Sequence, residues 1–129
     1  MASDRAQALR AATEAVAGIL DAGGDADDVL REAVAALQSR VPGYDWVGIS
    51  FVDEGALLLG PWAGVERAPG APPPVRVPIR FQGTTVAELG VAGPVPDDDE
   101  QVVLERLATL VAAHCLVGWD TDGVPWNVL

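Results

Sequence analysis

The chain has 129 residues, of which 50% are hydrophobic and 21% are charged, a composition typical of a single globular domain. Its formal net charge of −11, with 19 acidic side chains against eight arginines, excludes the electrostatic attraction on which binding to nucleic acids or anionic membranes depends. No apolar run approaches the roughly 20 residues of a membrane span, no secretory leader is recognisable, and a single cysteine forms no internal disulfide, so we expect a cytoplasmic protein.

The N-terminal part, residues 1–43, has the hydrophobic period of helices. An apolar stripe runs along residues 3–20 and predicts a first helix, which Gly23-Gly24 ends. A second helix begins near the carboxylates of residues 25–28, which favour the positive end of a helix dipole. It stops at Val41-Pro42-Gly43.

The next part, residues 44–64, has the alternating period of strands. Residues 46–52 alternate between two faces and predict a strand. Asp53-Glu54-Gly55 predicts a tight turn, because glycine readily adopts positive φ, and residues 56–62 return as a second strand. The proline-rich stretch 65–74 then predicts an extended surface connection.

Residues 75–92 predict a second hairpin. A strand over 75–81 has one apolar face, Gln82-Gly83 turns the chain, and residues 84–92 form the returning strand. Pro78 lacks the N–H that a central strand donates, so it indicates an edge strand or a bulge.

The last predicted element is a helix over residues 97–117. Asp97 and Glu100 have the spacing of a capping box at its start. The tail, residues 118–129, has no periodicity but contains two tryptophans, Trp119 and Trp126. Because disordered tails rarely carry tryptophan, we expect this tail to cover part of the sheet, in its own or a partner subunit.

The order of helix, helix, hairpin, hairpin and helix predicts an α+β fold. We expect a two-layer arrangement in which an antiparallel sheet of about four or more strands has the N- and C-terminal helices packed on one face.

Two segments carry a family resemblance. YDWVGISF at 44–51, followed by LLLGPWAG at 57–64, resembles the first hairpin of GAF domains, and in particular the WAGFY…LVLGPFQG of free methionine-(R)-sulfoxide reductases. The segment from VPIR at 77–80 to Val91 is similar to their late hairpin, VVPI…GxxxGVLDID, and the last predicted helix matches their closing helix. The resemblance implies the profilin-like GAF fold over the whole chain, 1–129.

The departures from the reductase pattern bear on activity. Ten residues join Gly64 to Val75, where the reductases have a long excursion that supplies their reactive cysteines. Cys115 lies on the last predicted helix and has no counterpart among those cysteines. The positions of the family's substrate carboxylates are taken here by Gly90, Ala92 and Pro74. We therefore expect no enzyme activity and no catalytic residue.

Two further patterns resemble reactive or metal sites, but a structural role explains each of them. His114 and Cys115 are adjacent on a helix and project about 100° apart, and two ligands fall short of the three or four of a zinc site. The acidic run 97–100 matches the charge preference of a helix start. We expect no metal and no cofactor.

The candidate ligand-binding residues lie on the two hairpins, on the sheet face where GAF domains hold ligands. They are Trp46, Trp62, Arg76, Arg80 and Glu88. One hypothesis is a polar clamp with an aromatic wall for a small anion or amino acid. The other is a cross-strand ion pair on a solvated face, with tryptophans that cover the sheet.

Three functional hypotheses follow. The first is a non-catalytic GAF-like regulatory or interaction domain that forms a homodimer through its helices or its open sheet face. The second is a small-molecule sensor with a retained pocket. The third is a divergent methionine sulfoxide reductase-like enzyme, which would need a nucleophile, a base and an orienting group in one place.

Overall fold

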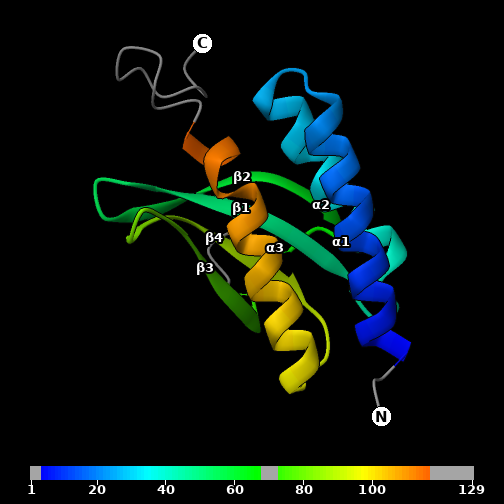
Figure 1. The fold of residues 1–129 in the computed structure, drawn as a ribbon. Helices are drawn as coiled ribbons and strands as arrows, with labels where there is room; N and C mark the ends of the chain where they lie inside the picture. The colour runs from blue at the N-terminus through cyan, green and yellow to red at the C-terminus, as the bar shows by residue number, and fades with distance from the viewer. Residues whose placement is uncertain (1–3, 68–72, 117–129) are drawn as a thin grey trace.

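A computed structural model describes residues 4–67 and 73–116 of the chain (Figure 1). Its elements, in chain order, are α1 (Asp4–Ala22), α2 (Ala26–Arg40), β1 (Trp46–Asp53), β2 (Ala56–Gly64), β3 (Val75–Phe81), β4 (Thr84–Ala92) and α3 (Asp98–Leu116). This is the order that the sequence predicts. None of the helices among the described residues has the length and apolarity that crossing a membrane requires.

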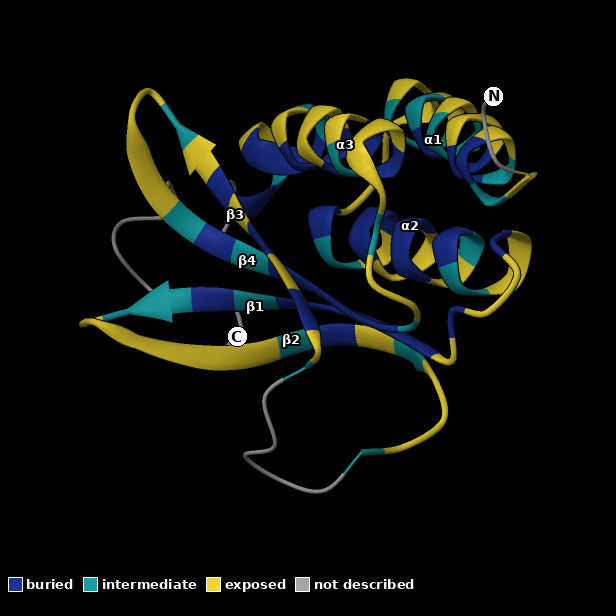
Figure 2. Ribbon diagram, turned by 90° about the horizontal axis from the view of Figure 1, so that it is seen from below, coloured by how far each residue is buried: buried dark blue, intermediate teal, exposed yellow. Residues whose placement is uncertain are grey.

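The four strands form one antiparallel sheet in the order β2-β1-β4-β3. Each hairpin supplies two neighbouring strands, and the pairing of β1 with β4 joins the hairpins at the centre. Figure 2 shows all three helices on one face of this sheet. The predicted two-layer α+β fold is therefore confirmed.

Both hairpins turn through two residues with positive φ. The values are 50° and 82° at Glu54 and Gly55, and 51° and 83° at Gln82 and Gly83. Positive φ at both central positions is typical of type I′ turns, whose twist matches that of the paired strands. The turns therefore fix the register of each hairpin locally.

The prolines of the strands lie where a missing N–H is tolerated. Pro78 belongs to the edge strand β3, one position before a register irregularity between Ile79 and Arg80. The edge position predicted from Pro78 is confirmed. Pro61, which the sequence analysis did not single out, belongs to the other edge strand, β2, at the irregularity of its pairing with β1.

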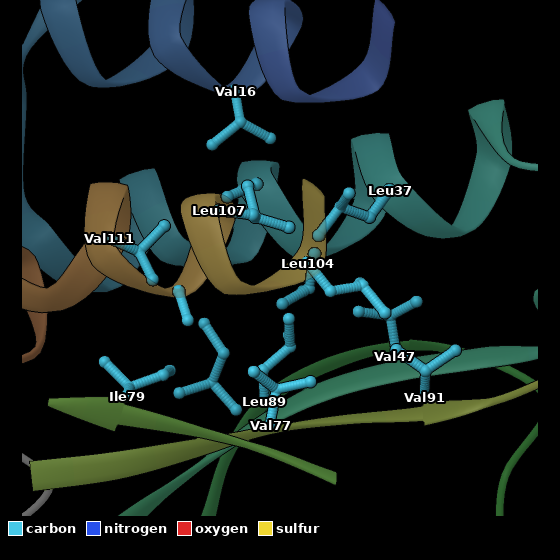
Figure 3. Close-up of a cluster of buried hydrophobic side chains, with 14 of the residues drawn as sticks. Val16, Leu37, Val47, Val77, Ile79, Leu89, Val91, Leu104, Leu107 and Val111 are labelled. Carbon is cyan, nitrogen blue, oxygen red and sulfur yellow. The ribbon is translucent and has the colours of Figure 1, made fainter. Parts of the chain in front are cut away.

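The hydrophobic core lies between the sheet and the helices (Figure 3). The sheet contributes buried side chains from alternate positions, which are Val47, Ile49, Val77, Ile79, Leu89 and Val91. The helices contribute Val16, Leu37, Leu104, Leu107 and Val111. Each such side chain contributes about 1.5–3 kcal/mol when fully buried, so this layer holds the sheet face in place.

The start of α3 combines the predicted cap with a long-range ion pair. The helix begins at Asp98, and the Asp97 carboxylate accepts a hydrogen bond from the Glu100 backbone N–H at 2.8 Å. The buried Glu100 carboxylate accepts two hydrogen bonds from Arg5 of α1, at 2.7 and 2.8 Å. A guanidinium is a strong partner for a buried carboxylate.

β2 extends two residues beyond the predicted end at Trp62. Gly64 pairs with Trp46 at the start of β1, and the Val65 N–H donates to the Asp45 carbonyl at 2.9 Å. The predicted connection therefore begins beside the sheet. The tail expectation, with Trp119 and Trp126, lies outside the described residues.

Candidate ligand face

All five predicted ligand residues belong to strands whose opposite face packs on the helices. Trp62 pairs with Gly48, Gly48 with Gly90, and Gly90 with Arg76, so these residues form one rung across the sheet. Because directly paired residues share a face, this rung lies on the side away from the core. We call this side the candidate ligand face.

The indole of Trp46 lies across the two glycines of this rung. A Cβ atom on Gly48 would overlap the Cη2 atom of the indole. A Cβ atom on Gly90 would lie 3.1 Å from Cζ3 of Trp46 and 2.6 Å from Cγ of Pro73. Gly48 and Gly90 thus form a cradle that only residues without a side chain can provide.

Both described ends of the proline-rich connection lie close to this indole. The guanidinium carbon of Arg67 lies 5.8 Å from the centre of the Trp46 ring, within the range of a cation–π interaction. Pro73 lies over Gly90 beside it. Trp46 is consequently only 6% exposed. The indole is thus a buried side chain that itself occupies part of this face.

Arg76 and Glu88 form a bidentate ion pair on the same face. The Arg76 Nε and Nη2 atoms donate to the two Glu88 carboxylate oxygens at 2.8 and 3.0 Å. The hydrogen bonds from Arg76 to Glu88, and then the carboxylate's charge, raise the pKa of Arg76 above its ordinary value. The pairing matches the ion-pair hypothesis, and each charge is already matched within the chain.

The remaining two predicted residues are more exposed. Trp62 is 40% exposed and lies across from Gly48, next to the cradle. Arg80 is exposed and lies beyond the irregularity of β3. The structure therefore brings Trp46, Trp62, Arg76 and Glu88 onto adjacent positions and leaves Arg80 towards one end. Ligand binding by these residues stays a prediction.

Cys115 lies on α3, in the core on the opposite side of the sheet from the candidate ligand face. Its side chain is fully buried, and this burial raises the pKa of the thiol from 9.0 to about 12. The thiol is therefore protonated at neutral pH and is a poor nucleophile. Within residues 4–67 and 73–116, no group of three or more histidine, cysteine, aspartate or glutamate side chains could hold a metal ion.

Four residues of this face were not predicted from the sequence. They are Gly48, Arg67, Pro73 and Gly90. Glycine inside a strand is a signal of close approach, and two such glycines on opposing strands are a stronger one. The signal was hidden because the direct pairing of β1 with β4 is a long-range contact that neither hairpin predicts.

No protein-family model and no curated protein matches the sequence. Solved structures do match. The free methionine-R-sulfoxide reductase of Neisseria meningitidis has a TM-score of 0.69 at 20% identity, over 89% of this chain and 92% of that one. The fRMsr of Staphylococcus aureus has 0.70 at 15% identity, over 83% and 95%.

The GAF domain of an Acinetobacter phosphoenolpyruvate-protein phosphotransferase matches with a TM-score of 0.62 at 13% identity, over 94% of this chain and 98% of that one. The chain has the GAF fold. The resemblance seen in the two hairpins is thereby confirmed at the level of architecture. GAF-fold neighbours include reductases as well as a domain of a phosphotransferase, so the fold leaves the activity open.

Proposed function

We propose that this GAF-fold chain is a non-catalytic regulatory or interaction domain. The observation that supports this most strongly is the placement of Trp46. Its indole occupies the Gly48/Gly90 cradle, beneath Arg67 and Pro73, on the face where the GAF resemblance places ligands. The chain's own side chain thus occupies the space over Gly48 and Gly90 into which a ligand group would otherwise fit.

The polar groups support the same proposal. A small anion or amino acid needs free charges, whereas Arg76 and Glu88 satisfy one another through two hydrogen bonds. A methionine sulfoxide reductase-like reaction needs a reactive thiol, whereas the Cys115 thiol is buried and its pKa is raised to about 12. The Arg76–Glu88 pair therefore has no free charge for a ligand, and the Cys115 thiol is not reactive.

Titration of the full chain with nucleotides, amino acids and methionine sulfoxide, followed by thermal unfolding, tests the proposal. We expect no saturable rise in the unfolding midpoint and no turnover of methionine sulfoxide in the presence of a dithiol. A saturable rise would identify a sensor instead. Turnover that disappears in a Cys115→Ser variant would identify an enzyme.

A second experiment tests whether Trp46 fills a ligand-sized space. The Trp46→Ala variant should lose about 3 kcal/mol of stability, because it removes a buried aromatic side chain and leaves a cavity. Free indole should then raise the unfolding midpoint of this variant and leave the wild type unchanged. Trp62→Ala is the matched control, because Trp62 lies on the same face but is 40% exposed. Equal responses of both variants to indole would contradict the proposal.

We extend the proposal to a homodimer formed through the helices. A shallow hollow between α1 and α3 is lined by Thr13, Glu105, Arg106, Thr109 and Leu110. Its mixed polar and apolar lining is typical of interfaces between folded domains. Sedimentation equilibrium of the full chain tests it, and a monomer at all concentrations would exclude the dimer.

A further inference from the structure

The edge strand β2 exposes a row of large apolar side chains. Leu57, Leu58 and Leu59 are 43%, 42% and 58% exposed, and Trp62 is 40% exposed. Figure 2 shows the first half of this strand in the colour of exposed residues. The other edge strand, β3, instead presents arginines and a proline on its exposed side. Natural sheets protect their edges with such residues, and a bare apolar edge is normally covered.

The arrangement of the three leucines indicates which kind of element could cover this edge. Leu57 pairs with Val52 and Leu59 with Ser50, on the candidate ligand face. Leu58 pairs with Phe51, whose side chain belongs to the helix-side core. The apolar surface therefore wraps around both sides of the edge. A helix lying on one face covers only one side, whereas an added strand contacts both.

We propose that the C-terminal segment of this chain, residues 117–129, adds a strand to the free edge of β2. The pairing part would be residues 124–129, VPWNVL, and residues 117–123 would link it to α3. Val124, Trp126 and Val128 would share one side of the added strand. The inference goes beyond the proposed function, because it assigns a partner to the edge of the sheet.

The position of α3 places this segment near the exposed edge. Val111, one turn before the end of α3, points to Ile79 of β3 in Figure 3. Ile79 pairs with Ala87, Ala87 with Phe51, and Phe51 with Leu58. The last turns of α3 therefore lie over the same rung of the sheet that ends at the exposed leucines.

The linker is long enough for this path. Strands lie about 4.8 Å apart and packed layers about 10 Å apart, so the added strand beyond β2 lies about 17–22 Å from a helix over β3 and β4. Seven extended residues span at most about 25 Å. Residues 117–123 can therefore carry the chain from α3 to the free edge without unwinding the helix.

A segment of the same chain fits the edge better than a second copy. The four exposed side chains offer on the order of 400 Å² of surface per chain, about half of the area that a stable interface buries on each partner. A tethered segment avoids this problem, because its local concentration is high whatever the protein concentration.

Hydrogen exchange of the full chain tests the inference. In the wild type, the amides of Leu57–Leu59 should be protected. In a Trp126→Ser variant their exchange should become about tenfold faster or more, because the added strand loses its main anchor. A Val95→Ser variant is the matched control, since Val95 is an 84% exposed apolar residue far from β2 in the sequence, and it should leave β2 unchanged.

A second variant tests the same contact by a substitution in β2. Leu59→Ser should speed amide exchange in residues 124–129 about tenfold, while exchange in α3 stays the same. Unprotected β2 amides in the wild type, or β2 exchange that is unchanged by Trp126→Ser, would overturn the inference. Protection of β2 that falls on twentyfold dilution would also overturn it, in favour of a second copy. None of these outcomes depends on the ligand titration, so the two proposals fail separately.

Discussion

At the scale of single residues, burial changes the acid–base chemistry of two side chains. Cys115 is fully buried, and burial raises the pKa of its thiol from 9.0 to about 12. Tyr44 is buried at the start of the first hairpin, and burial, with the nearby Glu100 carboxylate, raises the pKa of its phenol from 10.0 to about 12. Both groups are held in their neutral forms by the folded state.

This predicts an alkaline loss of stability. Unfolding returns both groups to water, where the thiol releases its proton above pH 9 and the phenol above pH 10. The unfolded state then binds fewer protons than the folded state, so the free energy of unfolding falls as pH rises. We expect it to be constant up to about pH 8 and then to fall by about 1.4 kcal/mol per pH unit for each group that titrates. Urea unfolding at closely spaced pH values measures this slope.

A Cys115→Ala variant provides the control for the alkaline slope. It should remove the fall between pH 9 and 10 and keep the fall above pH 10 that Tyr44 causes. A thiol reagent should modify Cys115 of the folded wild type at pH 8 far more slowly than that of the urea-unfolded chain. Equal rates of modification would mean that the thiol is not buried.

At the scale of elements, an ion pair joins the start of α1 to the start of α3. Arg5 donates two hydrogen bonds to Glu100, whose side chain is fully buried, whereas that of Arg5 is 28% exposed. An Arg5→Met variant should lose about 2 kcal/mol of stability, because a buried carboxylate is left without its partner and Arg5 itself is partly hydrated. Chemical unfolding of the variant measures the loss.

Replacing both partners separates the cost of a lone charge from the value of the pair. An Arg5→Met/Glu100→Leu double variant should recover most of the stability lost in Arg5→Met, because apolar side chains of similar size need no partner. A double variant that is less stable than Arg5→Met would show that the hydrogen bonds themselves stabilise the helix pair. Arg76→Ala, which breaks an exposed bidentate pair, should have little effect.

The elements themselves were predictable from the sequence because their signals are local. Gly55 and Gly83 supply the positive φ of their turns, and Pro78 indicates an edge strand without knowledge of the rest of the chain. The Arg5–Glu100 pair was not predictable, since it joins residues 95 positions apart. The spacing of Glu100 from Asp97 instead indicated a local partner for that carboxylate.

The same distinction between local signals and long-range contacts applies to the candidate ligand face. Strand alternation correctly placed Glu88 and Arg76 on the face away from the helices, and their ion pair was one of the two hypotheses. The orientation of Trp46 was not predictable. It depends on Gly90 and Pro73, which approach the indole only when β1 pairs with β4 and Pro73 lies over Gly90.

At the scale of the whole molecule, the net charge of −11 acts against compactness. Unfolding reduces the electrostatic repulsion between carboxylates that lie close together in the folded state. Added salt screens this repulsion. We expect the thermal unfolding midpoint to rise as sodium chloride increases from 10 to 200 mM at pH 7. The effect should shrink at pH 5, nearer to the isoelectric point of about 4.2. A midpoint that falls with salt at pH 7 would mean that favourable ion pairs outweigh the repulsion.

The central position of β1 and β4 also bears on how the chain reaches its native state. Each hairpin closes through two residues, which is a microsecond event in short chains. The seam between the hairpins joins Phe51 with Ala87 and Trp46 with Ala92, pairs that lie 36 and 46 positions apart. The chain between these paired residues must lose conformational entropy before the first contacts between β1 and β4 can form. We therefore expect the two hairpins to form early and independently. The pairing of β1 with β4 should then be the rate-limiting step of folding.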